Sequence, residues 1–365
     1  MQKGATVIDN ISVSVFRIPT DAHESDGTFE WDATTLVLVE AAAAEVKGIG
    51  FTYADRATAT LIHDSLGRVV TGLDAMDIPR AWMAMVGQIR NTGRPGVASM
   101  AISAVDNALW DLKARLLGQP LVKLLGAARD ALPIYGSGGF TSYSDEKLAK
   151  QLSDWIAQDI PRVKMKIGRE PDCDLHRVAV ARKAIGDEAK LFVDANGAYS
   201  RKQALEFACA FSEFDVKWFE EPVSSDDLEG LGMIRDHAPP GMDIAAGEYG
   251  YDETYFRRML EAGAVDVLQA DATRCAGISG FMMTDVLTQA AHIPLSSHCG
   301  PSMHLHAGCA ARTMRHAEYF HDHVRIENML LDGVAQPVGG ALRPDLSRPG
   351  HGLEFKHADA EQFKN

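Results

Sequence analysis

Ionisable side chains end successive short apolar runs in the second half of this chain, at nearly regular intervals. Neighbouring members of the series lie 23 to 28 positions apart. They are Lys166, Asp194, Glu220, Glu248, Asp271 and His298. This interval is typical of one strand followed by one helix, and in a parallel barrel the carboxyl ends of all strands face the same mouth. The spacing therefore predicts that these side chains meet at one site.

The middle of the series is a run of three carboxylates, Asp194, Glu220 and Glu248. Like charges held close together repel strongly in a low dielectric, so they must take up protons or bind a cation. A ligand set made only of oxygen selects a hard divalent ion, which is Mg²⁺ with Mn²⁺ as a substitute. Three protein ligands leave about three octahedral positions open, so the sequence predicts a catalytic magnesium centre.

Proton carriers flank the carboxylates on both sides. Lys164 and Lys166 are two positions apart, so both point to one side of their strand. One is expected to bind a substrate carboxylate, and the other to act as a base with a pKa lowered by its neighbour and the metal. Asp271 and His298 end adjacent strands, and a carboxylate beside an imidazole stabilises the imidazolium. We expect this pair to be a general acid/base dyad.

The elements that carry these residues alternate between strand and helix from about residue 132 onward. The apolar runs are 132–137, 163–167, 191–196, 217–222, 243–248, 265–271 and 293–298, with an eighth near 317–320. Parallel strands need a crossover between them, and a helix supplies it. The pattern predicts an α/β fold with a (β/α)8-type barrel. An open doubly wound sheet is disfavoured because no GxGxxG turn follows a first strand.

The chain before the barrel follows another pattern. Residues 13–18 and 34–41 alternate like antiparallel strands, the acidic segment 19–32 between them is expected to be a mobile loop, and 100–117 is expected to be a long helix. The Gly- and Pro-rich end is expected to pack back on this part. The predicted division is an N-terminal α+β domain (1–126), the barrel (127–327) and a C-terminal tail (328–365).

The composition narrows the classes of partner. The 365 residues contain 36 Lys and Arg against 50 Asp and Glu, a net charge of −14. Such a charge repels phosphate backbones and anionic lipids, so neither nucleic acid nor a membrane surface is an expected partner. No apolar run is long enough to span a bilayer, and no secretory signal is predicted at the start. Five cysteines without a CxxC motif favour a reducing, cytoplasmic location.

Together these motifs resemble the enolase superfamily, and within it the mandelate racemase subgroup (mandelate racemase/muconate lactonizing enzyme-like). Residues 102–126 resemble the long helix signature of the capping domain, and VKMK resembles the KxK motif. VDANGAY, FEEP and AGE carry the three carboxylates in family order, and QAD and SSHCG carry the Asp–His pair. The resemblance implies a capping domain built from the N-terminal part and the tail, one Mg²⁺, and removal of a proton α to a carboxylate through an ene-diolate.

The resemblance also implies a role for each residue of the series. The metal ligands would be Asp194, Glu220 and Glu248. Lys166 would be the base on one face of the substrate carbon, and His298, oriented by Asp271, would serve the opposite face. Lys164 would neutralise the carboxylate of the substrate.

Further site residues follow from the same resemblance. Glu318 resembles the residue that donates a proton to the carboxylate oxygen in racemases, with Glu327 as the alternative. Asn196 shares the face of Asp194 and is expected to line the site, and Tyr53 is a candidate substrate contact. The two loops that set specificity would be residues 20–31 and 50–55. Members of the family are usually homo-oligomers, so we expect one here.

Two activities fit these residues, and a third function belongs to another class. The first is dehydration of an acid sugar, an aldonate or aldarate, to a 2-keto-3-deoxy acid, which suits the polar segment 20–31. The second is racemisation or epimerisation of a 2-hydroxy acid, which also needs two opposed bases. The third is a metal-stabilised scaffold without catalysis, which has no use for acids and bases that face a cleft. In each enzyme the expected partner is a small carboxylate substrate.

Overall fold

The computed structural model describes residues 6–365 of the chain. Its N-terminal part is an antiparallel sheet in the order β1 (Asn10–Ser25), β2 (Glu30–Ala43) and β3 (Val46–Tyr53). The helices that follow are α1 (Ala57–Leu61), η1 (Ile62–Leu66), α2 (Gly67–Val70), α3 (Ile78–Gln88), α4 (Val97–Leu116) and α5 (Leu121–Leu125). These elements form one layer of helices on a sheet, as expected for an α+β cap.

The long helix α4 lies directly on β3. Gly48 and Gly50 make this close approach possible, since a Cβ atom added to Gly50 would lie 2.3 Å from the backbone nitrogen of Ala108. Apolar side chains of α4, among them Ile102 and Leu109, are fully buried in the core that the cap shares with its helices. The predicted long helix is confirmed, and it begins three residues before the expected start.

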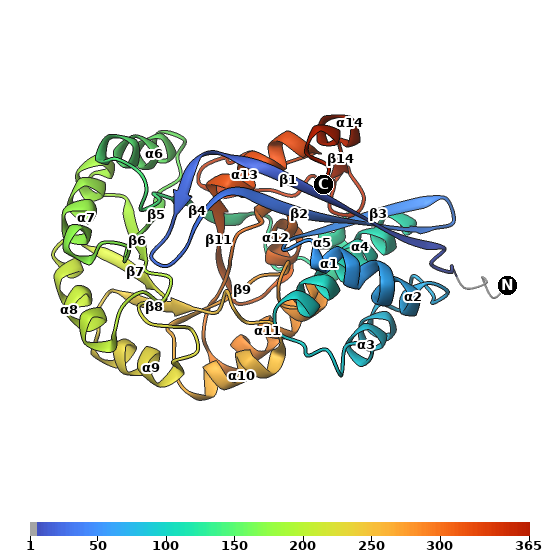
Figure 1. Cartoon of the computed structure of the whole chain (residues 1–365), viewed down its shortest axis with the longest axis horizontal. Helices are drawn as coiled ribbons and strands as arrows, with labels where there is room; N and C mark the ends of the chain where they lie inside the picture. The colour runs from blue at the N-terminus through green and yellow to red at the C-terminus, as the bar shows by residue number, and fades with distance from the viewer. Residues whose placement is uncertain (1–5) are drawn as a thin grey trace.

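The expectation of a mobile loop at residues 19–32 is wrong. The segment continues β1 and begins β2, so that the two strands form a long hairpin whose turn spans residues 26–29. Its polar side chains are satisfied locally, because Asp26 accepts hydrogen bonds from the backbone nitrogens of Thr28 and Phe29. Ser25 also contacts Thr141 of the barrel, with 2.6 Å between the hydroxyls. The hairpin extends from the cap across the barrel (Figure 1).

The predicted barrel is confirmed. Its parallel strands are β4 (Leu132–Gly138), β5 (Arg162–Lys166), β6 (Lys190–Asp194), β7 (Val216–Glu220), β8 (Asp243–Ala246), β9 (Val267–Ala270), β10 (Leu295–Ser297) and β11 (Met314–Phe320). Each strand pairs with the next, and β11 pairs with β4 to close the ring. At the bottom of the barrel, interior space is filled by large side chains such as Tyr135, Phe192 and Trp218. The barrel interior is therefore a packed core and not an open channel.

Helices surround the strands on the outside (Figure 1). They are α6 (Asp145–Ala157), α7 (Pro171–Ile185), α8 (Arg201–Ser212), α9 (Leu228–His237), α10 (Glu253–Glu261), α11 (Gly277–Ala291), α12 (Pro301–Ala310) and α13 (His321–Leu330). Several begin with side-chain caps, such as Ser200, which with Gln203 forms a capping box on α8. None of the helices within residues 6–365 combines the length and the hydrophobicity that a membrane-spanning segment requires.

The end of the chain returns to the cap. It contains β12 (Leu331–Asp332), β13 (Ala341–Leu342), β14 (Glu354–Phe355), α14 (His357–Ala360) and η2 (Glu361–Phe363). The ring of Phe355 packs on Phe16 of β1 at 5.2 Å, and the backbone nitrogen of Asn365 donates to Val15. The short strand β13 pairs with β4, so the tail contacts the cap and the barrel.

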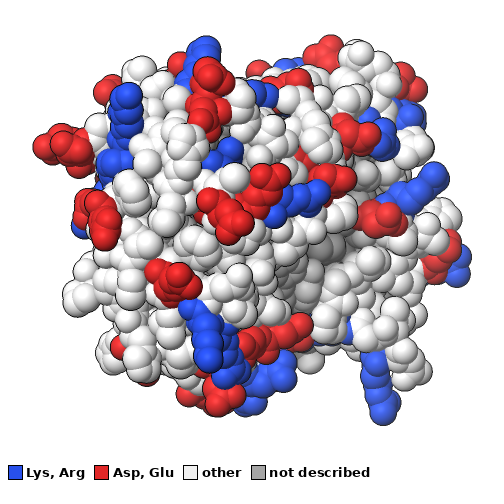
Figure 2. Space-filling model, turned by 60° about the vertical axis from the view of Figure 1, so that its left-hand side comes forward, with Lys and Arg blue, Asp and Glu red and all other residues white. Residues whose placement is uncertain are grey.

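Charged side chains of both signs are interspersed over the face shown in Figure 2.

Candidate active site

The strands deliver the predicted side chains to one rim of the barrel. Lys166, Asp194 and Glu220 are the last residues of β5, β6 and β7, and the register pairs Lys166 with Asp194 and Asp194 with Glu220. Asp271 and His298 directly follow β9 and β10, and Glu248 lies two residues beyond β8. These side chains are brought together, as their spacing predicted.

Asp194, Glu220 and Glu248 form a compact cluster, in which one oxygen of each lies within 4.8 Å of the others. All three are buried. Burial first, and then the charge of Asp194, raise the pKa of Glu220 well above its usual range. Oε2 of Glu248 is buried without a hydrogen-bond partner. Three converging buried carboxylates, one with an unused oxygen, fit a hard divalent cation such as Mg²⁺.

The two lysines supply the positive charge among these carboxylates. Nζ of Lys164 lies 2.5 Å from Glu220, 2.8 Å from Glu318 and 3.2 Å from Asp194. Nζ of Lys166 lies 2.5 Å from Oδ2 of Asp194. We expected a lowered pKa for Lys166. Burial and the charge of Lys164 do lower it, but the charges of Asp194, Glu248 and Glu220 together outweigh them and raise this pKa above its ordinary value.

His298 and Asp271 form the predicted pair on the other side. Nδ1 of His298 lies 2.8 Å from Oδ2 of Asp271, which leaves Nε2 to face Glu248 at 3.4 Å and the thiol of Cys299 at 3.2 Å. Burial raises the pKa of Asp271, but the hydrogen bond with His298 and the nearby His304 and Arg274 together outweigh burial and hold this pKa below its usual range. An ionised Asp271 holds the imidazole in one orientation.

Glu318 lies in the cluster, whereas Glu327 does not. Ser137 donates to Oε1 of Glu318 and the backbone nitrogen of Cys299 donates to Oε2. Burial raises the pKa of Glu318, but the nearby Lys164, His298 and Lys166 together outweigh it and hold this pKa well below its usual range. Glu327 lies on α13 and accepts a hydrogen bond from the backbone nitrogen of Ser302.

A cavity of about 440 Å³ opens above these groups, between barrel and cap. Lys166, Glu248, Asp271 and His298 line its floor. Asp26, Trp31 and Tyr53 of the cap line the opposite side. They belong to the two segments that were expected to set specificity, residues 20–31 and 50–55. Both segments were expected to be loops, but much of each is strand. Lys164, Glu220 and Glu318 lie below the floor and are fully buried.

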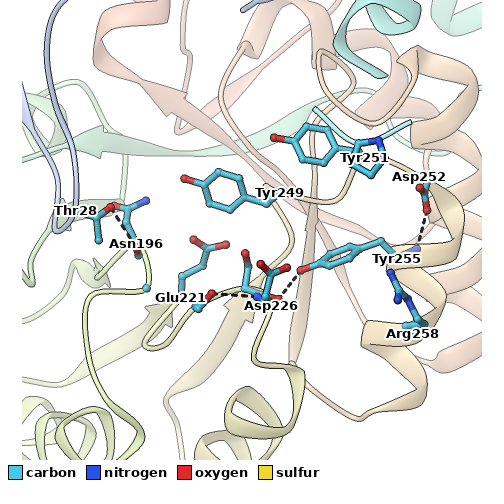
Figure 3. A pocket seen from close by; sticks show the side chains of 13 residues that line it. Thr28, Asn196, Glu221, Asp226, Tyr249, Tyr251, Asp252, Tyr255 and Arg258 are labelled. Atoms are coloured by element: carbon cyan, nitrogen blue, oxygen red, sulfur yellow. Dashed lines mark hydrogen bonds between the residues drawn. The ribbon is translucent and has the colours of Figure 1, made fainter. Parts of the chain in front are cut away.

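A second cavity, of about 640 Å³, adjoins the first (Figure 3). The two share Asn196 and Tyr249 as lining residues. Tyr255, Arg258 and the buried carboxylate of Glu221 are among the polar side chains that face it. Oε1 of Glu221 and Oδ1 of Asn196 are buried without hydrogen-bond partners. The combined space therefore exceeds what a two- or three-carbon acid needs.

The residues of the site that the sequence analysis missed include Arg274, Glu221, Tyr249 and Cys299. Arg274 is largely buried and its guanidinium lies 3.4 Å from Glu248 and 3.8 Å from Asp271. Glu221 and Cys299 have positive φ angles of 39° and 47°, like Asn196 at 47°. Their positions in the sequence could have pointed to them, since each follows a predicted site residue by one to three positions. Side chains just past a strand end are re-aimed by such left-handed residues.

The fold and this site define a capped (β/α)8-barrel enzyme with acids and bases around one carboxylate cluster. Family models match the chain as "Mandelate racemase / muconate lactonizing enzyme, N-terminal domain" over residues 12–126 and "Enolase C-terminal domain-like" over 147–360. The chain belongs to the mandelate racemase/muconate lactonizing enzyme family of the enolase superfamily.

Characterised relatives act on acid sugars. The chain is 31% identical to a 3,6-anhydro-alpha-L-galactonate cycloisomerase of Streptomyces coelicolor, over 95% of this chain and 96% of the relative. It is 34% identical to the L-talarate/galactarate dehydratase of Salmonella typhimurium, over 72% of this chain and 67% of the relative.

Solved structures agree with the fold throughout. A mandelate racemase/muconate lactonizing enzyme-like protein from Rubrobacter xylanophilus shares 50% identity, with a TM-score of 0.96 over 98% of this chain and 99% of that one. A racemase from Streptomyces coelicolor with bound magnesium shares 29% identity, with a TM-score of 0.91 over 98% of this chain and 100% of that one. The L-talarate dehydratase from Polaromonas sp., complexed with Mg and L-glucarate, shares 28% identity, with a TM-score of 0.88 over 98% of this chain and 97% of that one.

Proposed function

We propose that this protein removes the proton α to a carboxylate and dehydrates an acid sugar, an aldonate or aldarate, to a 2-keto-3-deoxy acid. One observation carries the proposal: Lys166 and the His298–Asp271 pair both line a single cavity, with Glu248 between them on its floor. An α-proton next to a carboxylate is very weakly acidic, so its removal needs a base and positive charge in one preorganised place.

Asp194, Glu220 and Glu248 are the proposed ligands of Mg²⁺. The divalent cation would supply the positive charge that a substrate carboxylate needs when its α-carbon loses a proton. The relatives complexed with magnesium support this assignment. Mn²⁺ has the same ligand preference and is the expected substitute.

The chain's own residues then divide the work. We propose that Lys166, once it has lost its own proton, takes the C2 proton and that His298, as imidazolium, gives a proton to the departing C3 hydroxyl, which leaves as water. The pairing of Lys166 with Asp194 opposes that loss, and a divalent cation held by Asp194 would weaken the pairing. Asp271 orients His298 and, as an anion beside it, stabilises the imidazolium form. Lys164 lies below the cavity floor, and we propose that its charge offsets that of the substrate carboxylate from there, while Glu318 holds Lys164 in place. Glu318 would act as a carboxylate-side acid only after taking up a proton, which its pairing with Lys164 opposes.

The walls favour a polyhydroxylated substrate. Asn196, Tyr53 and Tyr249 line the first cavity, and Asn196 and Tyr249 continue into the second one. The orphaned oxygens of Asn196 and Glu221 are acceptors that hydroxyl groups of a sugar can satisfy. An aromatic 2-hydroxy acid would leave them unpaired. The relatives that act on talarate, galactarate and anhydrogalactonate support the same class.

Racemisation or epimerisation of a 2-hydroxy acid is the second candidate. Two bases that approach one cavity from different strands can each exchange a proton on one face of a carbon, and the racemase from Streptomyces coelicolor is a structural neighbour. The two activities differ in their product, because only dehydration yields a keto acid.

The proposal includes the parts that position the site. We propose that the cap consists of residues 1–126 and the tail 328–365, and that the barrel consists of residues 127–327. The contacts of the tail with β1 support its assignment to the cap. Homo-oligomeric assembly, a cytoplasmic location and the exclusion of nucleic acid stay predictions from the sequence.

A panel of aldonates and aldarates incubated with the protein and Mg²⁺ tests the proposal, with a carbonyl reagent to detect 2-keto acids. We expect at least one acid sugar to give keto acid. If none does, while a 2-hydroxy acid exchanges its α-hydrogen with D₂O, the racemase assignment replaces the dehydratase.

A further inference from the structure

We propose that Asp21, Glu24 and His321 form a second divalent-cation site, specific for a transition metal such as Zn²⁺, which fastens the β1–β2 hairpin to the barrel. Asp21 and Glu24 lie on β1, and His321 is the first residue of α13. One potential ligand atom of each residue lies within 4.8 Å of the other two. This cluster is separate from the carboxylates at the mouth and has no part in the proposed reaction.

Glu24 is the residue of this cluster whose carboxylate has a buried oxygen without a partner. Its side chain is fully buried, and its Oε2 accepts a hydrogen bond from the indole nitrogen of Trp31 at 2.8 Å. Its Oε1 is buried without any partner. A buried carboxylate oxygen without a donor or cation is costly, so a partner that can reach it is strongly favoured.

The strand is shaped so that Asp21 and Glu24 share one side. In a regular strand, residues three positions apart point to opposite faces. Here the pairing of β1 with β2 is interrupted between Pro19 and Glu24. Such an irregularity re-aims side chains. Both carboxylates therefore reach His321, and Nε2 of His321 lies 3.0 Å from Oδ2 of Asp21.

The surroundings leave the cluster with excess negative charge. The nearby Asp322 is occupied by Thr34 and by the guanidinium of Arg325, which also donates to the carbonyl oxygen of Pro19. Arg325 thus pairs with Asp322 and not with Glu24. Among the described residues, Asp21 pairs with His321, and neither Asp21 nor Glu24 forms a salt bridge with a lysine or arginine. A divalent cation would remove this imbalance.

The donor set indicates the kind of metal. One imidazole nitrogen and two carboxylates suit Zn²⁺ or a similar borderline ion, whereas the all-oxygen cluster at the mouth suits Mg²⁺. Bonds near 2.1 Å place tetrahedral ligand atoms about 3.4 Å apart, so the side chains must close by roughly an ångström. His321 and Asp21 are partly exposed, which leaves room for that movement and for a water ligand.

A cation here would hold the part of the cap that covers the active-site cavity. The same hairpin carries Asp26, Phe29 and Trp31, which line that cavity. Ser142 already donates to the carbonyl oxygen of His23, so a metal would strengthen an existing contact between cap and barrel. Occupancy of the site would therefore set how firmly the hairpin is held over a substrate.

Equilibrium dialysis of the full-length protein against Co²⁺, a spectroscopic substitute for Zn²⁺, tests the proposal. The number of ions bound per chain is compared among the wild type, His321→Ala, Glu24→Gln and the control His23→Ala. His23 is an exposed histidine of the same hairpin and lies outside the cluster. Circular dichroism verifies that each variant is folded.

We expect His321→Ala and Glu24→Gln each to bind one Co²⁺ fewer per chain than the wild type, and His23→Ala to bind as many as the wild type. The visible Co²⁺ spectrum of a nitrogen-containing site should disappear with the lost ion. Equal numbers of bound ions in the wild type and His321→Ala would overturn the proposal. Because the comparison counts ions and does not use turnover, its outcome is independent of the proposed dehydratase activity.

Discussion

His298 and Asp271 are the residues on which the proposed elimination most depends. Replacement of His298 by Asn removes the imidazolium but keeps a polar side chain of similar size. Because a positioned acid or base contributes about 10²–10⁴-fold, we expect turnover to fall by that factor. Exchange of the C2 hydrogen by Lys166 should persist, since Lys166 reaches the cavity from another strand.

Proton NMR in D₂O separates the two effects. His63→Asn is a matched control, because His63 also pairs with an aspartate, Asp64 at 2.8 Å, but lies exposed on the cap. Loss of C2 exchange together with turnover would make His298, and not Lys166, the residue that takes the first proton.

Glu327 gives the protein a pH-dependent stability that is separate from catalysis. Burial raises its pKa from 4.5 to about 7, so the folded state favours the protonated form. Its stabilising effect is therefore complete below about pH 4.5 and is lost as the pH rises through about 7. Glu327→Gln keeps a neutral side chain at every pH. Relative to this variant, the wild type should lose up to about 3 kcal/mol of unfolding free energy between pH 4.5 and 8.

Urea unfolding at a series of pH values measures this difference. If the wild type and Glu327→Gln change in parallel across the whole range, Glu327 is ionised in the folded protein and the argument from burial is wrong.

The β1–β2 hairpin depends on the turn that Asp26 closes. Its carboxylate accepts two backbone hydrogen bonds, from Thr28 and Phe29. Asp26→Ala should weaken the turn by about 1–2 kcal/mol and increase amide exchange at these two residues about tenfold or more. KM should rise with it, because the hairpin forms one wall of the cavity.

Asp345→Ala removes a similar aspartate turn, at Ser347 in the exposed tail, and is the matched control. It should change neither KM nor exchange in the hairpin. An unchanged KM in Asp26→Ala would show that the hairpin does not contribute to substrate binding.

Replacement of a glycine by alanine should have opposite effects at Gly50, which lies in the contact between β3 and α4, and at Gly87, which lies outside it. A methyl group at Gly50 would lie 2.3 Å from the backbone nitrogen of Ala108, so Gly50→Ala must push the helix from the sheet and should cost about 1–3 kcal/mol. Gly87 lies in α3 with nothing within 4 Å of the added methyl, so Gly87→Ala should stabilise by up to about 1 kcal/mol. Thermal unfolding of both variants measures the two signs, and equal shifts would contradict the packing.

For the molecule as a whole, the barrel and the gathering of its rim residues were predictable from sequence. Each strand–helix unit has nearly constant length, so Asp194, Glu220 and Glu248 fall at one height of the ring. The hairpin at residues 19–32 was not predictable, because its polar side chains are satisfied by the barrel and by its own turn. Arg274 was missed for a similar reason, since only the fold shows that it faces Glu248.

The central claim is that the carboxylate cluster and the flanking bases act together on an α-proton. Proton NMR of a panel of acid sugars in D₂O, with EDTA-treated protein before and after addition of Mg²⁺, tests it most directly. We predict that the C2 hydrogen of at least one acid is lost only after Mg²⁺ is added, and not in Glu220→Gln. Undiminished loss of that hydrogen in the metal-free protein would contradict the account.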